Sequence, residues 1–389
     1  LEPTSAPFVG TPSASTLPKF PMDGYVMTFA KDGYLYFQDE ENTPVQLAPV
    51  DEEAKQSYIS DDNQKVVFHG ADGNIYSINS DGSQKQVLIS KDWKDSLKAG
   101  MSISIDGFVP DSHQIFFRTN LCESSQEVWP PCSTGLFLAD ADTDNIKNLA
   151  DLGLASQLGL PTRNIRISPN GKMIAIGNME HMDILDMDGN IIRQNILTYK
   201  PSTTRILFPS FFWLPDSSGL TIALPDFTNK DGYLAYSIWR YTIENQSAVQ
   251  IALVPTPLYE DFTFDVSPDG NWIVYGDSQS YAIFLGNLVT EQVSTIMEYP
   301  DMSHFSWSSD SNHFLYGGAL ENMATVNNPL SSTSVCGDGT WVDASHFTCI
   351  MPELYYGLGM AVIKGGEVKN YTFGLEMSIV YGSVFIKPK

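Results

Sequence analysis

The chain has 389 residues, and acidic side chains outnumber basic ones by 46 to 22, which gives a formal net charge of −24. This charge disfavours nucleic acid and anionic membrane surfaces as partners. No stretch reaches the roughly 18 consecutive apolar residues of a membrane-spanning helix, so the sequence predicts no transmembrane segment. The acidic excess favours solubility, with attraction of cations or of a basic partner as the alternative interpretation.

The first 22 residues are rich in Pro, Ser and Thr, a composition typical of a linker. We therefore expect a linker or tail at residues 1–22 and a folded domain at residues 23–389. A linker at the start indicates that a cleaved signal or a lipid-anchored cysteine precedes residue 1, and a cloning boundary or a plain tail is the alternative. We expect an extracellular or cell-surface protein, with the periplasm as the alternative.

From residue 24 onward one pattern recurs: an apolar strand, a tight turn of Ser, Pro, Asp, Asn and Gly, and a second apolar strand. The clearest copies are residues 165–176 and 264–275. Repeats at this spacing are typical of solenoids, propellers and arrays. Looser copies begin near Tyr58, Phe108, Phe212, Phe305 and Trp341.

Each repeat continues into a second hairpin. After the strand at 66–69, a third strand is predicted at 73–78 and a fourth at 86–89, with an Asp81-Gly82 turn between them. Asp-Gly steps between apolar runs are strong hairpin signals because both residues tolerate positive φ. Four-stranded antiparallel units in series predict an all-β fold, a single β-propeller.

The turns at Ser168-Pro169-Asn170-Gly171 and Ser267-Pro268-Asp269-Gly270 carry a family resemblance. With the Asp-Gly turn that follows in each unit, they resemble the TolB-type, WD-like propeller repeat over nearly all of residues 24–389. The resemblance implies a propeller fold and no particular activity, because propellers host very different functions.

The number of repeats favours eight blades. The N-terminal unit, residues 26–48, lacks a first strand, and the apolar segment 378–386 is a surplus strand at the C-terminus. We expect this segment to complete the N-terminal blade and close the ring, since an open array leaves unpaired sheet edges. Seven blades is the alternative, because the short unit that starts at Ser303 can merge with the unit at Trp341.

The four cysteines fall into two local pairs, Cys122 with Cys132 and Cys336 with Cys349. Local pairing of an even number favours two disulfides and an oxidising compartment. Four unrelated buried thiols are the alternative.

Loop lengths differ between the two ends of the predicted disc. The turns between first and second strands, and between third and fourth strands, are tight, whereas the insertions fall in the other connections. Binding residues concentrate in loops on a rigid scaffold, so we expect the long-loop face to bind a partner. The exposed candidates there are Trp93, Trp129 and Phe227; loops that merely cover the channel mouth are the alternative.

Catalytic motifs are absent from the sequence. There is no Gly-x-Ser-x-Gly elbow, and the six histidines show no metal-binding spacing. Asp140, Asp142 and Asp144 alternate as in a calcium loop, but the repeat places a turn at this position and we favour the turn. We expect no cofactor, with a weak calcium site as the alternative.

These observations favour an exported, non-catalytic propeller that acts as a binding or assembly scaffold for a protein or surface glycan. The first alternative is a carbohydrate-active enzyme with a site at the channel mouth. The second is a self-assembling extracellular structural subunit, and no oligomeric state follows from the sequence.

Overall fold

The computed structural model contains 31 strands and one short helix, α1 (Lys91–Ser96), in its described part. None of the described segments forms a helix with the length and apolar character that a bilayer crossing needs. The described residues are 17–40, 42–50, 57–97, 101–122, 132–154, 164–177, 181–199, 209–226, 234–256, 264–277, 282–298, 304–317, 321–351, 357–365, 367–373 and 382–386.

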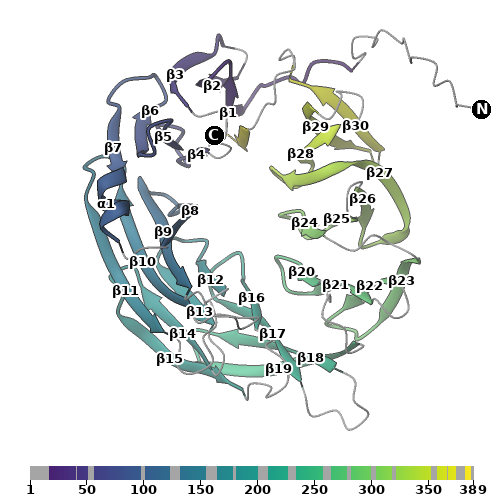
Figure 1. The fold of residues 1–389 in the computed structure, drawn as a ribbon. Helices are drawn as coiled ribbons and strands as arrows, with labels where there is room; N and C mark the ends of the chain where they lie inside the picture. Colours follow the sequence, from purple (N-terminus) through teal and green to yellow (C-terminus); the bar gives the residue numbers. More distant parts are fainter. Residues whose placement is uncertain are drawn as a thin grey trace, which may run out of the picture.

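The strands form eight four-stranded antiparallel blades arranged in a ring (Figure 1). This confirms the all-β propeller and the preference for eight blades. The first blade contains β31 (Gly382–Ile386), β1 (Tyr25–Lys31), β2 (Tyr34–Asp39) and β3 (Val45–Pro49); the second β4 (Ser57–Ile59), β5 (Lys65–His69), β6 (Ile75–Asn79) and β7 (Gln86–Ile89). The third contains β8 (Ser102–Phe108), β9 (Gln114–Cys122), β10 (Cys132–Asp140) and β11 (Ile146–Leu154); the fourth β12 (Asn164–Ile167), β13 (Met173–Gly177), β14 (His181–Asp186) and β15 (Ile191–Thr198).

The remaining four blades continue the ring in chain order, and in each the first strand lies innermost (Figure 1). The fifth contains β16 (Ser210–Trp213), β17 (Gly219–Asp226), β18 (Leu234–Thr242) and β19 (Ser247–Thr256); the sixth β20 (Phe264–Val266), β21 (Trp272–Asp277), β22 (Ala282–Asn287) and β23 (Val293–Glu298). The seventh contains β24 (His304–Trp307), β25 (His313–Gly317), β26 (Glu321–Thr325) and the first half of β27 (Asn328–Trp341); the eighth its second half, β28 (His346–Met351), β29 (Gly357–Lys364) and β30 (Glu367–Thr372).

The long strand β27 explains why seven blades was a reasonable alternative. Its first half pairs with β26 and its second half with β28, without an intervening loop. A seven-stranded sheet results, in which β27 is the outer strand of one blade and the inner strand of the next.

The C-terminal strand closes the ring as predicted. β31 pairs antiparallel with β1, from Tyr25 opposite Ile386 to Phe29 opposite Gly382. The first blade is therefore built from both ends of the chain.

Residues 17–22 make a second contact across this seam. The Phe20 N–H donates to the Thr372 carbonyl oxygen at 2.7 Å, and the Thr372 N–H donates to the Pro18 carbonyl oxygen at 2.9 Å. Phe20 and Met22 are buried with Met27 of β1 and Met360 of β29. The described end of the Pro/Ser/Thr-rich segment thus packs against the propeller.

The turn serine of the repeat has a structural role that its burial explains. The Ser267 hydroxyl donates to Asp269 at 2.6 Å and accepts the Trp272 N–H at 2.9 Å. Asp269 in turn accepts the Asn271 N–H at 2.9 Å. A buried hydroxyl is stable when it is hydrogen-bonded, and these bonds also hold the tight turn. The same arrangement recurs at Ser60, Ser168 and Ser308.

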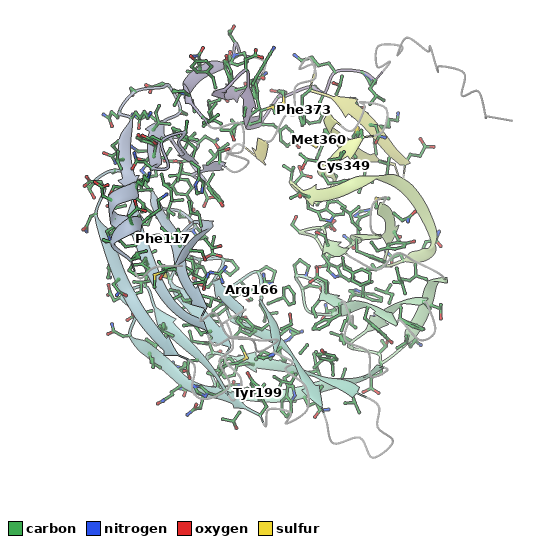
Figure 2. The ribbon with its side chains drawn as sticks, in the orientation of Figure 1. Phe117, Arg166, Tyr199, Cys349, Met360 and Phe373 are labelled. Atoms are coloured by element: carbon green, nitrogen blue, oxygen red, sulfur yellow. The ribbon has the colours of Figure 1, made fainter. Side chains whose placement is uncertain are left out.

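The core consists of apolar clusters, most of them formed where neighbouring blades face each other. Phe117 of β9 stacks on Phe137 of β10 with ring centroids 5.2 Å apart, and Ile75 and Leu88 of the previous blade pack against them. Figure 2 shows side chains filling the spaces between blades, whereas Arg166 lies at the inner rim.

The cysteines are placed for local pairing. Cys122 and Cys132 are direct partners in the β9–β10 register. Cys349 is fully buried on β28, the neighbour of the strand that carries Cys336. The two predicted disulfides stay a prediction, since the side chains of the other three cysteines lie outside the described ones.

Candidate functional site

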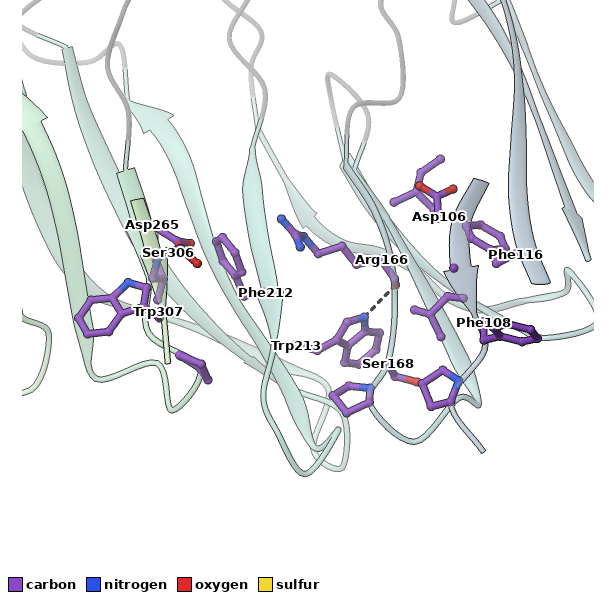
Figure 3. A pocket seen from close by; sticks show the side chains of 17 residues that line it. Asp106, Phe108, Phe116, Arg166, Ser168, Phe212, Trp213, Asp265, Ser306 and Trp307 are labelled. Atoms are coloured by element: carbon purple, nitrogen blue, oxygen red, sulfur yellow. Dashed lines mark hydrogen bonds between the residues drawn. The ribbon is translucent and has the colours of Figure 1, made fainter. Parts of the chain in front are cut away.

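A pocket of about 600 Å³ lies where the inner strands of five consecutive blades, the third to the seventh, face one another (Figure 3). We call it the channel pocket. Its wall includes Pro110, Pro169 and Pro268 from the turns between first and second strands, so it lies toward the tight-turn end of the disc. The charged and aromatic side chains that line it include Asp106, Arg166, Phe212, Trp213, Asp265 and Trp307.

One position of the repeat supplies much of this lining. It is the last residue but one of the inner strand, and it carries Arg166 in β12, Phe212 in β16, Asp265 in β20 and Ser306 in β24. The flanking residues of these strands are mostly apolar and pack between blades. The residue at this position is charged, aromatic or polar depending on the blade. This variation at a fixed place in the repeat is the feature of the sequence that points to the pocket.

Arg166 presents a guanidinium group to the pocket. Its guanidinium carbon lies 4.6 Å from the centre of the Phe212 ring, a cation–π distance. In the described part of the chain, no hydrogen bond or ion pair is formed by the guanidinium. Desolvation by the surrounding protein lowers the pKa of the Arg166 guanidinium, and the negative charge of Asp265 opposes this shift. The group stays cationic, since arginine deprotonates only far above neutral pH.

Asp106 lies on the opposite wall from Asp265, in the irregular part of β8. Both oxygens of its carboxylate accept hydrogen bonds from Arg118, at 2.7 Å from Nε and 2.6 Å from Nη2. Burial raises the pKa of the Asp106 carboxyl, and Arg118 opposes the rise. Burial, together with the charge of Asp106, also raises the pKa of the nearby Tyr58 phenol.

Five aromatic residues line the pocket, and three of them belong to β16 and β24. Trp213 and Trp307 are each 7% exposed and lie at the ends of β16 and β24, and Phe212 is next to Trp213. The Trp213 indole N–H donates to the carbonyl oxygen of Arg166 at 2.9 Å, the dashed line in Figure 3. This bond fixes the backbone that carries the guanidinium. A cavity with aromatic walls and a few convergent charges is the usual form of a small-molecule site.

Of the binding residues expected from the sequence, Trp93 is among the described residues, and it does not line the channel pocket. Trp93 belongs to α1, where it packs edge-on against Phe117 and Phe137 with centroids 5.9 and 5.6 Å away. It is partly buried and contributes to the core. Trp129 and Phe227, and the loops that carry them, lie outside the described residues.

A second cavity, the acidic pocket, collects carboxylates from the second and third blades. It is lined by Asp61, Asp62, Asp111, Ser112, His113, Gln114, Asp140 and Asp142.

Asp140, Asp142 and Asp144, for which the sequence favoured a turn over a weak calcium site, form a turn at the rim of the acidic pocket. Asp140 accepts the N–H of Asp142 at 2.8 Å, and Asp144 has a positive φ of 57°. Asp142 is already paired, with Lys65 at 2.8 Å and His113 at 2.8 Å. Among the residues that the structure describes, no group of three or more His, Cys, Asp or Glu side chains is arranged to hold a metal ion.

Comparison with known proteins identifies no family. No family model matches the chain, and no curated protein matches it. The TolB-type repeat family therefore stays a resemblance, while the eight-bladed propeller is established by the structure.

Several solved structures share the fold. An oligogalacturonate lyase from Vibrio parahaemolyticus is 13% identical with a TM-score of 0.47, covering 78% of this chain and 85% of that chain. An oligogalacturonate lyase in complex with manganese is 14% identical, with the same TM-score and coverage. A eukaryotic initiation factor is 12% identical with a TM-score of 0.48, covering 94% of this chain and 99% of that one. At these identities the likeness concerns the fold alone.

The leading functional prediction, a non-catalytic scaffold, is corrected by these findings. Two of the solved structures that share the fold are named as lyases, so the fold gives no support to a non-catalytic scaffold. The prediction had relied on the absence of a catalytic motif in the sequence. In a propeller, however, residues from separate blades can line one pocket, as Asp106, Arg166 and Asp265 do, so a site does not require a contiguous motif.

Proposed function

We propose that this protein is a carbohydrate-active enzyme whose site is the channel pocket and whose substrate is an acidic oligosaccharide. The observation that carries the proposal is the Arg166 guanidinium, which faces the pocket and forms no hydrogen bond or ion pair among the described residues. The chain has a net charge of −24, so acidic side chains that could pair with this guanidinium are abundant, and its lack of an ion pair in the described part of the chain is notable. A guanidinium that is left for a ligand matches a carboxylate in shape and charge.

The aromatic walls support a sugar as the carrier of that carboxylate. The faces of pyranose rings expose C–H groups that pack on flat aromatic surfaces, and the partly exposed Phe212 offers such a surface beside Arg166. Burial of this apolar area adds to the binding free energy beyond the charge pair. The substrate class is thus a chain of sugar rings that bear carboxylates.

Asp106 is the residue to which we assign acid–base chemistry. A carboxyl whose pKa is raised by burial holds and releases a proton closer to neutral pH. Arg118 holds both of its oxygens and so fixes the orientation of the group. Asp265, on the other side of Arg166, is a second carboxylate in the same pocket.

Calorimetric titration with oligogalacturonate tests the binding part, because each ring of this probe carries a carboxylate. We expect it to bind more tightly than a neutral oligosaccharide of equal length. Arg166→Met should weaken binding at least about tenfold, since a charged hydrogen bond contributes about 1.5–3 kcal/mol. Arg193→Met, which removes a guanidinium from the outer strand β15 of the same blade, is the matched control and should bind normally.

Turnover is tested by the appearance of new sugar chain ends. Asp106→Asn should lower the rate about 100-fold or more while affinity changes only a few-fold, because acid–base groups contribute roughly that much to rate. Equal binding of acidic and neutral oligosaccharides, or unchanged binding by Arg166→Met, would refute the proposal.

A further inference from the structure

The last residue of the inner strand is tryptophan in three blades: Trp213 in β16, Trp307 in β24 and Trp341 in β27. In two of them the indole N–H crosses to the previous blade. Trp213 donates to the carbonyl oxygen of Arg166 at 2.9 Å, and Trp341 donates to that of Ser306 at 3.1 Å. Both acceptors occupy the last position but one of an inner strand. The bond is therefore a repeated device that joins neighbouring inner strands.

Trp307 departs from this pattern. By the same register its acceptor would be the carbonyl oxygen of Asp265 in β20. Its indole nitrogen is buried instead without a hydrogen-bond partner in the described part of the chain. The side chain itself is only 7% exposed and is held against Phe314, with ring centroids 5.0 Å apart.

The unpaired donor lies in the wall of the channel pocket. Trp307, Ser306 and Asp265 all line this pocket. In Figure 3 the nitrogen-bearing edge of the indole is turned toward Ser306 and Asp265, the side on which the pocket lies. A buried N–H without an acceptor is unfavourable, and a ligand oxygen that reaches it removes that cost.

We propose that the Trp307 indole N–H is a specificity-determining donor of the channel pocket, which binds a hydroxyl or carboxylate oxygen of the bound saccharide. This inference rests on the proposed function. Arg166 and Trp307 then contact one ligand from two sides, the fourth blade and the seventh. A pocket with such an unpaired donor rejects ligands that lack an oxygen at that point, because the N–H would stay unsatisfied.

Three matched variants test the assignment: Trp307→Phe, Trp213→Phe and Trp341→Phe. Each removes an indole N–H and keeps an aromatic ring. Trp307→Phe should weaken oligogalacturonate binding about three- to tenfold, the usual range for one neutral hydrogen bond. Trp341→Phe should bind as the wild type, because its lost bond is structural and Trp341 does not line the pocket.

Thermal unfolding gives a second measurement that separates the roles. Trp213→Phe and Trp341→Phe each lose a bond between blades, so their Tm should fall more than that of Trp307→Phe, which loses none.

Nuclear magnetic resonance on the unmutated protein gives a readout that does not depend on variant folding. With indole nitrogens labelled, the Trp307 N–H signal, identified by its absence in Trp307→Phe, should shift downfield on addition of oligogalacturonate. A Trp307 signal that does not move in ligand-saturated protein overturns the inference. The inference is also overturned if Trp307→Phe binds oligogalacturonate as tightly as Trp341→Phe does while Arg166→Met loses binding. In that case the proposed function still stands. If the wild type binds no acidic oligosaccharide, both proposals fail.

Discussion

His113 joins the second and third blades through two carboxylates. Its Nε2 lies 3.0 Å from Asp62, in the turn after β4, and its Nδ1 lies 2.8 Å from Asp142, in the turn after β10. Partial burial by itself lowers the pKa of the imidazole, but the bonds to Asp142 and Asp62 outweigh it and raise that pKa above 6.5. The pKa values of Asp62 and Asp142 are lowered, against the effect of burial, by hydrogen bonds from Ser60 and Lys65 respectively and from His113.

The pH dependence of stability follows from the directions of these shifts. A raised histidine pKa stabilises the fold below the unfolded value of about 6.5, and the contribution is lost as pH rises through the folded value. The two lowered carboxyl pKa values act in the opposite sense, and their contribution is lost as pH falls below about 4. The contact between these blades is thus strongest between about pH 4 and 6.5.

We predict that His113→Gln destabilises the protein more at about pH 5.5 than at about pH 8.5. The difference should be below about 1 kcal/mol, because all three groups are partly exposed to solvent. Urea unfolding at the two pH values measures it. Adding Asp62→Asn to His113→Gln should cause little further loss at pH 5.5, and an equal effect of His113→Gln at both pH values would contradict the prediction.

At the scale of single elements, some of the tight turns between strands contact the neighbouring blade. Gly189 lies in the turn between β14 and β15 with a φ of 87°, and a Cβ there would overlap the carbonyl oxygen of Leu149 in β11. Gly33, between β1 and β2, has a similar φ of 77°, but a Cβ added there would meet no atom within 4 Å. The two glycines therefore share a backbone conformation and differ in what surrounds them.

We predict that Gly189→Ala lowers the free energy of unfolding by about 2–4 kcal/mol, because the rigid backbone of the neighbouring blade must shift. Gly33→Ala should cost about 1 kcal/mol, the strain of a left-handed alanine alone. Chemical denaturation of both variants compares these values. If the two alanines are equally destabilising, the Gly189 turn is not a contact between blades.

Ring closure is a property of the whole molecule. β31 is the inner strand of the first blade, and residues 17–22 pair with β30 across the same seam. Tyr25 and His346 also meet there on Asp343, whose oxygens lie 2.8 Å from the Tyr25 hydroxyl and 2.9 Å from His346 Nδ1. The seam is therefore held by backbone pairing and by side chains from both ends of the chain.

We predict that a chain ending at Gly374, which lacks β31, loses its cooperative thermal transition and associates. Removal of β31 leaves β1 as an unpaired inner edge, and such edges template aggregation. A chain ending at Ile386 keeps β31 and is the control. Size-exclusion chromatography and calorimetry distinguish the two, and a soluble product that ends at Gly374 with an unchanged Tm would show that the N-terminal contact suffices.

Much of this fold could be predicted from the sequence because its determinants are local. The hydroxyl of the turn serine bonds residues within five positions of itself, as that of Ser267 does with Asp269 and Trp272. The missing first strand at the N-terminus and the surplus strand at the C-terminus were also visible in the sequence, and they predicted closure. The junction at β27 was less clear, since one strand there serves two blades.

The residues of the channel pocket were not predicted, although a site at the channel mouth was the first alternative, and the leading functional prediction was wrong for the same physical reason. Asp106, Arg166 and Asp265 belong to three different blades and are far apart in the sequence. Only the curvature of the closed ring brings them together. Trp93 was predicted to be an exposed binding residue, but packing against Phe117 and Phe137 depends on how α1 sits on the third blade.

The sequence by itself determined the repeat, the strands and the turns, since these depend on hydrophobic alternation and on hydrogen bonds between near neighbours. It also contained the variable position before each turn, where Arg166, Phe212, Asp265 and Ser306 stand. Only the tertiary structure decided that this position faces a common pocket, because the direction of these side chains depends on the orientation of one blade relative to the next. The unpaired indole of Trp307 is likewise a property of the ring, since its missing acceptor would come from another blade.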